Sequence, residues 1–176
     1  MPEKVELVSP TRALEVSYRG HVAEFVARGE HLVPFSIGFD LSDFGALLQR
    51  LEGCSKGVGV DGFVPHSTFW LVRGGSEVVG VSNLRHALIP KLLREGGHIG
   101  YGIRPSARGQ GLGNEILRLT LGRAVAMGLQ EALVTCDKAN VASARVIVRN
   151  GGTLDSEIFI EERGVMLQRY WIRGLG

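Results

Sequence analysis

Hydrophobic side chains along this chain recur either at every second position, as in strands, or at every third to fourth position, as in helices. Strand-like segments are expected at 5–8, 68–73, 78–84, 98–103, 132–136, 153–160 and 165–172. Helix-like segments are expected at 11–28, 40–52, 113–127 and 140–149. Because strands precede, separate and follow the helices, the pattern predicts a mixed α/β fold built on one twisted sheet.

Glycines and charged residues mark the connections between these segments. Gly74-Gly75 joins two strands as a hairpin, and residues 161–164 join the last two strands. Residues 53–67 are glycine-rich and read as a loop; beside a substrate cleft such a loop can act as a lid, although loose surface loops are commoner. The continuous apolar run 132–136 indicates a central strand that is covered on both faces.

Composition narrows the class of protein. A chain of 176 residues with 44% hydrophobic and 22% charged residues is typical of one soluble domain, here residues 1–176. A net charge of +2 argues against a nucleic-acid-binding surface as the main role. No apolar run approaches the roughly 20 residues that span a bilayer, and the first residues lack a signal-peptide pattern, so we expect a cytoplasmic protein that does not act at a membrane.

Two cysteines, Cys54 and Cys136, have neither a disulfide framework nor metal-ligand spacing, so no metal site is expected.

The segment between the expected strand at 98–103 and the helix that follows is the most informative part of the chain. It contains three glycines in alternation, Gly109, Gly111 and Gly113. Glycine allows close backbone approach to a ligand and positive φ angles. The first amides of the following helix lack intrahelical partners, and the helix dipole adds partial positive charge there. The order of strand, glycine-rich turn and helix therefore predicts a site for a diphosphate.

Three diphosphate motifs compete for this segment. A P-loop needs Lys followed by Ser or Thr after the glycines, and this chain has neither there. A dinucleotide fingerprint needs G-x-G-x-x-G after an early strand. Gly109 and Gly111 satisfy its first half, but Asn114 stands at the third glycine; Glu131 lies at a tolerable distance for a ribose-binding acid, so this alternative stays open. The third motif is R-x-x-G-x-G, which Arg108 begins.

The third motif belongs to a wider resemblance. With Ile103-Arg104-Pro105 before the loop, the apolar strand after its helix, and then a helix that starts at Asn140 and ends at Gly151-Gly152, the chain resembles the GCN5-related N-acetyltransferase (GNAT) superfamily over about residues 76–172. Residues 79–101 look more narrowly like bacterial predicted acetyltransferases of unassigned substrate. The resemblance implies one mixed, twisted, mostly antiparallel sheet flanked by helices.

The resemblance also implies a co-substrate, acetyl-coenzyme A. Its pyrophosphate would bind the loop amides, its pantetheine arm would pair with strand residues 101–103 as an added strand does, and Arg108 would contact phosphate oxygens. A strand amide near Gly102 would stabilise the oxyanion. The residues expected to bind the coenzyme are Tyr101, Gly102, Ile103, Arg108, Gly109, Gln110, Gly111, Leu112, Gly113, Asn140 and Ser143.

Catalytic residues are less completely matched. Many family members carry a Glu about ten residues before the loop arginine; His98 stands there and is our candidate general base, because imidazole titrates near neutral pH. Ile147 replaces a Tyr that often protonates the leaving thiolate, which leaves the general acid open, with Tyr101 a remote candidate. Asn83 and Arg85 are expected to line the acceptor site, where Arg85 would favour a carboxylate on the substrate.

Two classes of function follow. The leading hypothesis is an N-acetyltransferase that moves acetyl from acetyl-coenzyme A to a primary amine of a small molecule, amino acid or peptide by direct attack in a ternary complex. The rival is a catalytically weak coenzyme A-binding sensor or interaction module, which the Ile147 substitution favours slightly. A nucleotide-binding oxidoreductase is a third alternative, which binding of NAD would establish. The final hairpin offers a surface for a homodimer.

Overall fold

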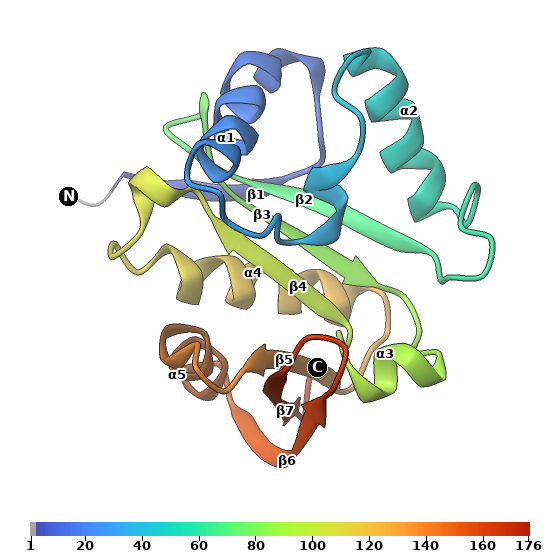
Figure 1. Ribbon diagram of the computed structural model, residues 1–176. Helices are drawn as coiled ribbons and strands as arrows, with labels where there is room; N and C mark the ends of the chain where they lie inside the picture. Colours follow the sequence, from blue (N-terminus) through green and yellow to red (C-terminus); the bar gives the residue numbers. More distant parts are fainter. Residues whose placement is uncertain (1–2) are drawn as a thin grey trace.

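The computed structural model describes residues 3–176, which form two antiparallel sheets (Figure 1). The first sheet has the order β1-β2-β3-β4 and the second the order β5-β7-β6. The strands are β1 (Val5–Val8), β2 (His66–Arg73), β3 (Glu77–Arg85), β4 (Ile99–Ile103), β5 (Ala132–Asp137), β6 (Gly152–Ile160) and β7 (Val165–Ile172). The mixed α/β class and the antiparallel pairing expected from the sequence are confirmed.

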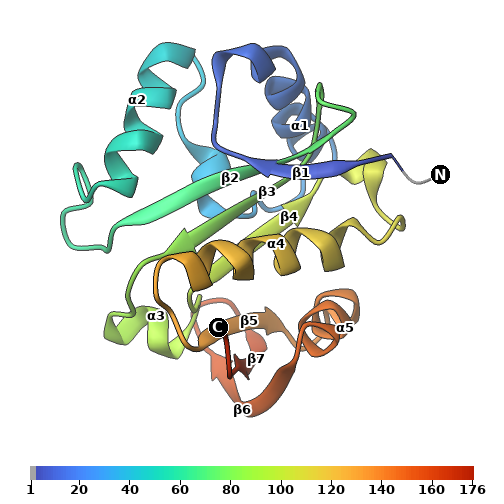
Figure 2. The same cartoon turned by 180° about the vertical axis from the view of Figure 1, so that it is seen from behind.

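Helices cover both faces of the first sheet (Figures 1 and 2). The α1 and α2 helices pack on one face and α4 on the other; α5 lies beside α4 and the second sheet. The helices are η1 (Arg12–Leu14), α1 (Glu15–Ala27), η2 (Phe35–Gly38), α2 (Phe44–Ser55), α3 (Pro90–Arg94), η3 (Pro105–Ala107), α4 (Leu112–Ala126) and α5 (Val141–Arg149). No helix among the described residues is long and apolar enough to cross a membrane.

Alternation along β2 places large side chains in two separate cores. Trp70 is fully buried on the α1 side, where its ring stacks on Tyr18 at 4.4 Å between centroids. The next residue, Leu71, is equally buried but packs with Ile116 of α4 on the opposite face. Successive side chains of a strand point to opposite faces, so an apolar pair at consecutive positions anchors both helical layers to one strand.

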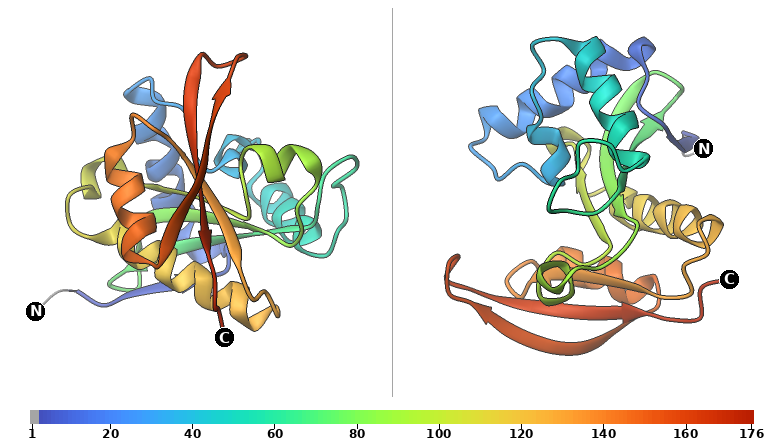
Figure 3. Two further views of the ribbon diagram at one scale, coloured as in Figure 1. Left: turned by 90° about the horizontal axis from the view of Figure 1, so that it is seen from below. Right: turned by 90° about the vertical axis from the view of Figure 1, so that its right-hand side faces the viewer.

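The hydrogen-bonded ladder is divided between β4 and β5, and in this respect the expectation of one sheet with 132–136 at its centre is wrong. The two strands meet at one end only, where the His98 N–H donates to the Leu133 carbonyl at 2.7 Å. Beyond that point β4 and β5 separate (Figure 3), and β7 takes the central place of the second sheet. The β5 strand is apolar because helices and the first sheet cover it, although it lies at a sheet edge.

Candidate active site

A cavity of about 660 Å³ opens where β4 and β5 separate. Four segments form its wall: β4, the loop that leads into α4, one side of α5, and the stretch from the end of α1 toward η2. Its lining includes ten of the eleven residues expected to bind the coenzyme; the exception is Gln110. The lining residues are Phe25, Glu30, His31, Val33, Tyr101, Gly102, Ile103, Ala107, Arg108, Gly109, Gly111, Leu112, Gly113, Asn114, Asn140, Ala142, Ser143, Val146 and Arg149.

The edge of β4 that faces this cavity presents backbone groups that pair with no other strand among the described residues. On the other edge the ladder to β3 continues to Arg104, whose N–H donates to the Val79 carbonyl at 2.8 Å. Alternate residues of an antiparallel strand hydrogen-bond to the same neighbour, so Gly102 bonds to β3. Tyr101 and Ile103 therefore direct their N–H and C=O groups toward the cavity. These are the groups to which an extended, amide-containing ligand would add as a strand.

The loop before α4 presents a run of free amides. Gly109 and Gly111 have φ angles of 76° and 78°, and a side chain at either position would meet no atom within 4 Å. Within residues 3–176, none of the N–H groups of residues 109–113 donates to a protein acceptor. The fifteen-residue helix α4 begins here, so its dipole adds to these donors. Consecutive free amides at a helix N-terminus fit a pyrophosphate.

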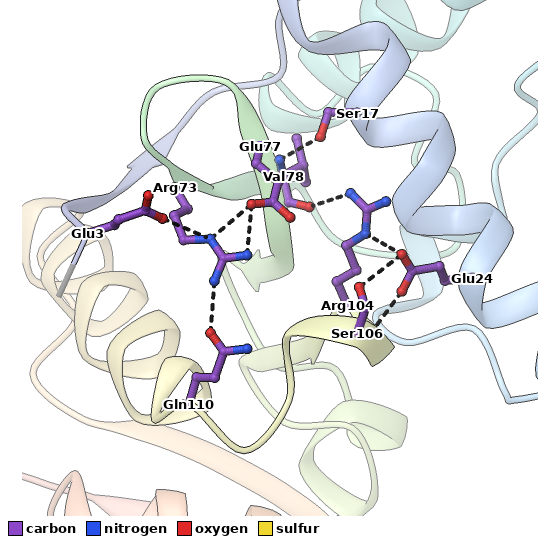
Figure 4. A network of polar contacts seen from close by, with 9 residues as sticks. All are labelled: Glu3, Ser17, Glu24, Arg73, Glu77, Val78, Arg104, Ser106 and Gln110. Atoms are coloured by element: carbon purple, nitrogen blue, oxygen red, sulfur yellow. Dashed lines mark hydrogen bonds and ion pairs between the residues drawn. The ribbon is translucent and has the colours of Figure 1, made fainter.

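Side chains outside the cavity brace this loop (Figure 4). Glu24 of α1 accepts from the Arg104 Nε–H at 2.6 Å and from the Ser106 N–H at 2.9 Å, which fixes η3 against α1. On the other side of the loop, the Gln110 Oε1 accepts from Arg73 Nη1 at 2.8 Å. Gln110 thus points toward the β2–β3 hairpin, and only its backbone remains for a ligand. The loop is therefore held in shape by contacts that leave its amides free.

Arg108 is placed in the cavity and is already paired with a carboxylate. Its Nη1 and Nη2 donate to the two carboxylate oxygens of Glu30 at 3.0 and 2.6 Å, and its Nε donates to the Ile103 carbonyl at 3.3 Å. The hydrogen bonds from Arg108, together with those from Arg28, hold the pKa of Glu30 at about 2. An internal anion, Glu30, thus occupies the two-nitrogen fork of the guanidinium.

Two hydroxyl groups meet across the cavity. The Tyr101 hydroxyl of β4 lies 3.0 Å from the Ser143 hydroxyl of α5, so one donates to the other. Burial raises the pKa of Tyr101 to about 12, which keeps its proton in place at neutral pH. The Asn140 Oδ1 caps α5 by accepting from the Ser143 N–H at 3.1 Å, which fixes the position of Ser143. The pair supplies O–H donors in the gap between the two sheets.

Four residues singled out in the sequence lie away from this cavity. His98 is buried, and its Nδ1 accepts from the Leu133 N–H at 2.9 Å; burial lowers the pKa of His98. Asn83 and Arg85 are buried on β3, on the face of the first sheet that α1 and α2 cover. Ile147 is fully buried in the core against Gly152 and contributes no polar group.

Several cavity residues carry no signal in the sequence. Phe25, Glu30, His31 and Val33 come from the end of α1 and the segment after it, about 75 residues before the loop that they face. No local motif marks them, and only the packing of α1 on the first sheet brings them to the site. Arg149 lies in the last turn of α5 and belongs to no motif in the sequence, and the structure places it on the cavity wall.

A loop of free amides at a helix N-terminus, a strand edge without a partner strand and a pair of hydroxyls between two separating sheets fit a coenzyme A-dependent acyltransferase. The sequence matches the family described as Acetyltransferase (GNAT) domain over residues 42–153, more than half of the chain. The protein therefore belongs to the GNAT acetyltransferases, which use acetyl-coenzyme A as the acetyl donor. A search of curated proteins gives no significant match.

Solved structures share this fold at low sequence identity. RimL, a ribosomal L7/L12 alpha-N-protein acetyltransferase in complex with coenzyme A, is 18% identical with a TM-score of 0.71, over 98% of this chain and 96% of that chain. MccE, a Microcin C7 self immunity acetyltransferase in complex with acetyl-CoA and AMP, is 13% identical with a TM-score of 0.70, over 97% and 92%. The putative acetyltransferase yncA from Salmonella typhimurium, with acetyl-CoA, is 12% identical with a TM-score of 0.66, over 96% and 93%.

Proposed function

We propose that this acetyltransferase moves the acetyl group of acetyl-coenzyme A directly to a primary amine of a small molecule, amino acid or peptide in a ternary complex. One observation carries the proposal. The free amides of residues 109–113 and the free edge of β4 border one continuous cavity, so a diphosphate and an amide-containing arm fit together in it. The structures of RimL with coenzyme A and of MccE with acetyl-CoA support the same use of the fold.

Each part of the cavity has a proposed role in holding the donor. The amides of the glycine loop bind the pyrophosphate, and Arg108 exchanges Glu30 for a phosphate oxygen. Backbone groups of Tyr101 and Ile103 pair with the pantetheine arm, and one of their N–H groups stabilises the oxyanion that develops on the thioester carbonyl. Arg149 is a further cation on the wall of the cavity for a phosphate of the coenzyme. The coenzyme supplies the activated acetyl thioester.

The proton for the leaving thiolate is proposed to come from the Tyr101–Ser143 pair. Ile147 has no proton to give, whereas these two hydroxyls lie within hydrogen-bond distance of each other in the cavity. Replacing Tyr101 with Phe is expected to lower kcat about 100-fold while the Kd for acetyl-coenzyme A changes little. Tyr170→Phe, at a tyrosine outside the cavity, is the matched control.

The general base is proposed to be one of two histidines. His98 follows from the family pattern, and its Nε2 is the ring nitrogen left free by Leu133. His31 lies on the cavity wall and is exposed. Deprotonation of the attacking ammonium requires a base within reach of the amine, directly or through one water. The pH dependence of kcat/KM in His98→Gln and His31→Gln assigns the role: the variant that loses the acidic limb has lost the base.

Two measurements test the proposal in sequence. Calorimetric titration with acetyl-coenzyme A, with NAD and ATP as controls, should give selective binding of the coenzyme; selective binding of NAD would instead establish the oxidoreductase. Thiol release is then followed with a panel of amines. Turnover with any amine establishes the transferase, whereas binding without turnover across the panel supports the rival, a coenzyme A-binding sensor.

The β6–β7 hairpin supports a homodimer as part of this proposal. Leu154, Phe159 and Met166 of this hairpin are exposed apolar side chains. Sedimentation of the purified protein tests the association, since replacing Phe159 with Ser should convert any dimer to a monomer.

A further inference from the structure

Arg85 is a buried cation with no anionic partner. Its side chain comes from the end of β3, and the residue is only 7% exposed. No carboxylate among residues 3–176 lies within ion-pair distance of it. A guanidinium taken out of water without a counter-charge destabilises the folded state. Such a residue is expected where an anion binds from outside.

The hydrogen bonds of Arg85 leave one edge of its guanidinium free. The Nη1 donates to the carbonyls of Gly96 and Gly97 at 2.9 and 3.3 Å, which fixes the plane of the group. The Nε is buried and has no partner, and the Nη2 donates to no described residue. The Nε and Nη2 protons point the same way and form a fork whose spacing matches the two oxygens of a carboxylate.

The surroundings of this free edge are uniformly basic or neutral. Burial, and then the positive charges of Arg85, His86 and Arg50, hold the pKa of His66 at about 4. The Asn83 Nδ2 bonds to His66 Nδ1 at 2.8 Å, while the Asn83 Oδ1 is buried without a donor. The guanidinium carbon lies 5.4 Å from the ring centroid of Phe35, a side chain that is 39% exposed. The guanidinium is therefore next to a side chain that contacts solvent.

Arg85 lies at the end of β3, beside the start of β4, and this position separates it from the glycine loop that follows β4. Its Nη2 lies 3.3 Å from where a Cβ on Gly100 would be, near the start of β4. Arg108 lies past the other end of that strand, in the loop that follows Ile103. A strand rises about 3.3 Å per residue, so the three steps from Gly100 to Ile103 already cover about 10 Å. An anion at Arg85 is therefore distinct from the phosphates at the loop and belongs to the other substrate.

We propose that Arg85 binds a carboxylate of the acceptor, and that the preferred acceptors are amino acids or short peptides whose amine and carboxylate lie close together. This inference rests on the proposed acetyl transfer and specifies its substrate class. A Cβ at Gly100 would lie only 3.3 Å from Nη2, so the glycine keeps this nitrogen from being crowded, and the carbonyls of Gly96 and Gly97 fix the plane of the guanidinium. Arg85 is accordingly a specificity residue: it binds the acceptor carboxylate equally well in the bound substrate and in the transition state.

The kinetic test uses pairs of acceptors that differ only in the acid. Each amino acid is compared with its amide as an acceptor in thiol release. The wild-type kcat/KM is expected to favour the acid about 10-fold to 100-fold. Arg85→Lys should reduce that ratio and Arg85→Gln should abolish it, with the Kd for acetyl-coenzyme A unchanged. Arg173→Gln, at an exposed arginine outside the site, is the matched control and should keep the ratio. A wild-type ratio near one would overturn the proposal.

A second test is independent of turnover, and its measurement is made on the wild-type protein. The Arg85 Nε–H resonance of the wild-type protein is followed in a ¹⁵N correlation spectrum in the presence of coenzyme A, and is assigned by its absence in Arg85→Lys. Addition of N-acetyl amino acids should shift this resonance, and addition of their amides or of inorganic phosphate should not. No shift with any carboxylate, or an equal shift with the amides, would reject the carboxylate site even if acetyl transfer is established. A shift without any turnover would retain the anion site and reject the transferase.

Discussion

At the residue scale, the site depends on a few positions where one chemical property is indispensable. Gly109 and Gly111 of the loop before α4 are such positions because their φ angles of 76° and 78° are strained for any residue with a Cβ. Arg108 is another, since its guanidinium is held in the cavity by Glu30 and the Ile103 carbonyl. At these positions a single residue determines the direction in which hydrogen-bond donors of the site point.

A substitution at Gly111 should separate loop geometry from overall stability. Gly111→Ala places a Cβ at a φ of 78°, which is expected to destabilise the protein by about 1–2 kcal/mol. The Kd for acetyl-coenzyme A should rise about tenfold as the amides turn away. Gly128 at the opposite end of α4 has a φ of 88° and equal open space, so Gly128→Ala is the matched control. Equal Kd values for the two variants would contradict binding at the loop. Calorimetry and denaturant unfolding give the two quantities.

At the element scale, the decisive feature is the single point of contact between β4 and β5. His98 and Leu133 exchange two hydrogen bonds there, one from each backbone N–H. Past this point the strands separate and the β4 edge is left without a partner strand. The gap between β4 and β5 thus ends at the His98 ring, and the cavity lies at the opposite end of the gap.

Removal of the His98 ring should loosen this junction. In His98→Ala the buried Leu133 N–H loses its acceptor, which is expected to destabilise the protein by about 1–3 kcal/mol. Hydrogen exchange at the Leu133 amide should accelerate relative to amides of β7, and turnover should fall with it. A large loss of turnover with unchanged exchange at Leu133 would show instead that His98 acts as the general base.

At the scale of the whole molecule, three hydrophobic clusters form the core of the described residues, and a neutral histidine is buried beside the cluster that includes α1. His21 is fully buried in α1 between Tyr18 and Phe25, and neither ring nitrogen has a partner among the described residues. Burial, aided by Arg104 and outweighing Glu24, holds the pKa of His21 at about 4. The unfolded chain therefore binds a proton at a pH where the folded protein does not.

This difference predicts a loss of stability in mild acid. Because the pKa of His21 is lowered from 6.5 to about 4, stability is retained above pH 6.5 and decreases as pH falls toward 4. The slope contributed is up to about 1.4 kcal/mol per pH unit. His21→Leu should reduce the slope over this range, with buried His66 contributing part of what remains, and the exposed His31→Leu should leave the slope unchanged. Denaturant unfolding from pH 4 to 7 measures both; identical slopes in His21→Leu and wild type would refute the assignment.

The sequence by itself determined the local features of this protein. Apolar periodicity placed the helices and strands within a few residues, because burial on one face imposes the repeat directly. The glycines, Arg108 and the Asn140 cap could be predicted because a helix N-terminus and its anion site are built from consecutive residues. The sequence identified Arg85 as a candidate residue, but it could not show that this side chain is buried without a carboxylate partner.

Only the tertiary structure decided where the ladder divides and which distant residues meet. Residues 132–136 are apolar whether β5 lies at the centre of a sheet or at an edge covered by helices, so the pattern could not show the separation from β4. Glu30 and Arg108 are joined by the packing of α1 on the first sheet, and Tyr101 and Ser143 by the position of α5. Pairings across such distances arise from the whole packed fold, and no local pattern encodes them.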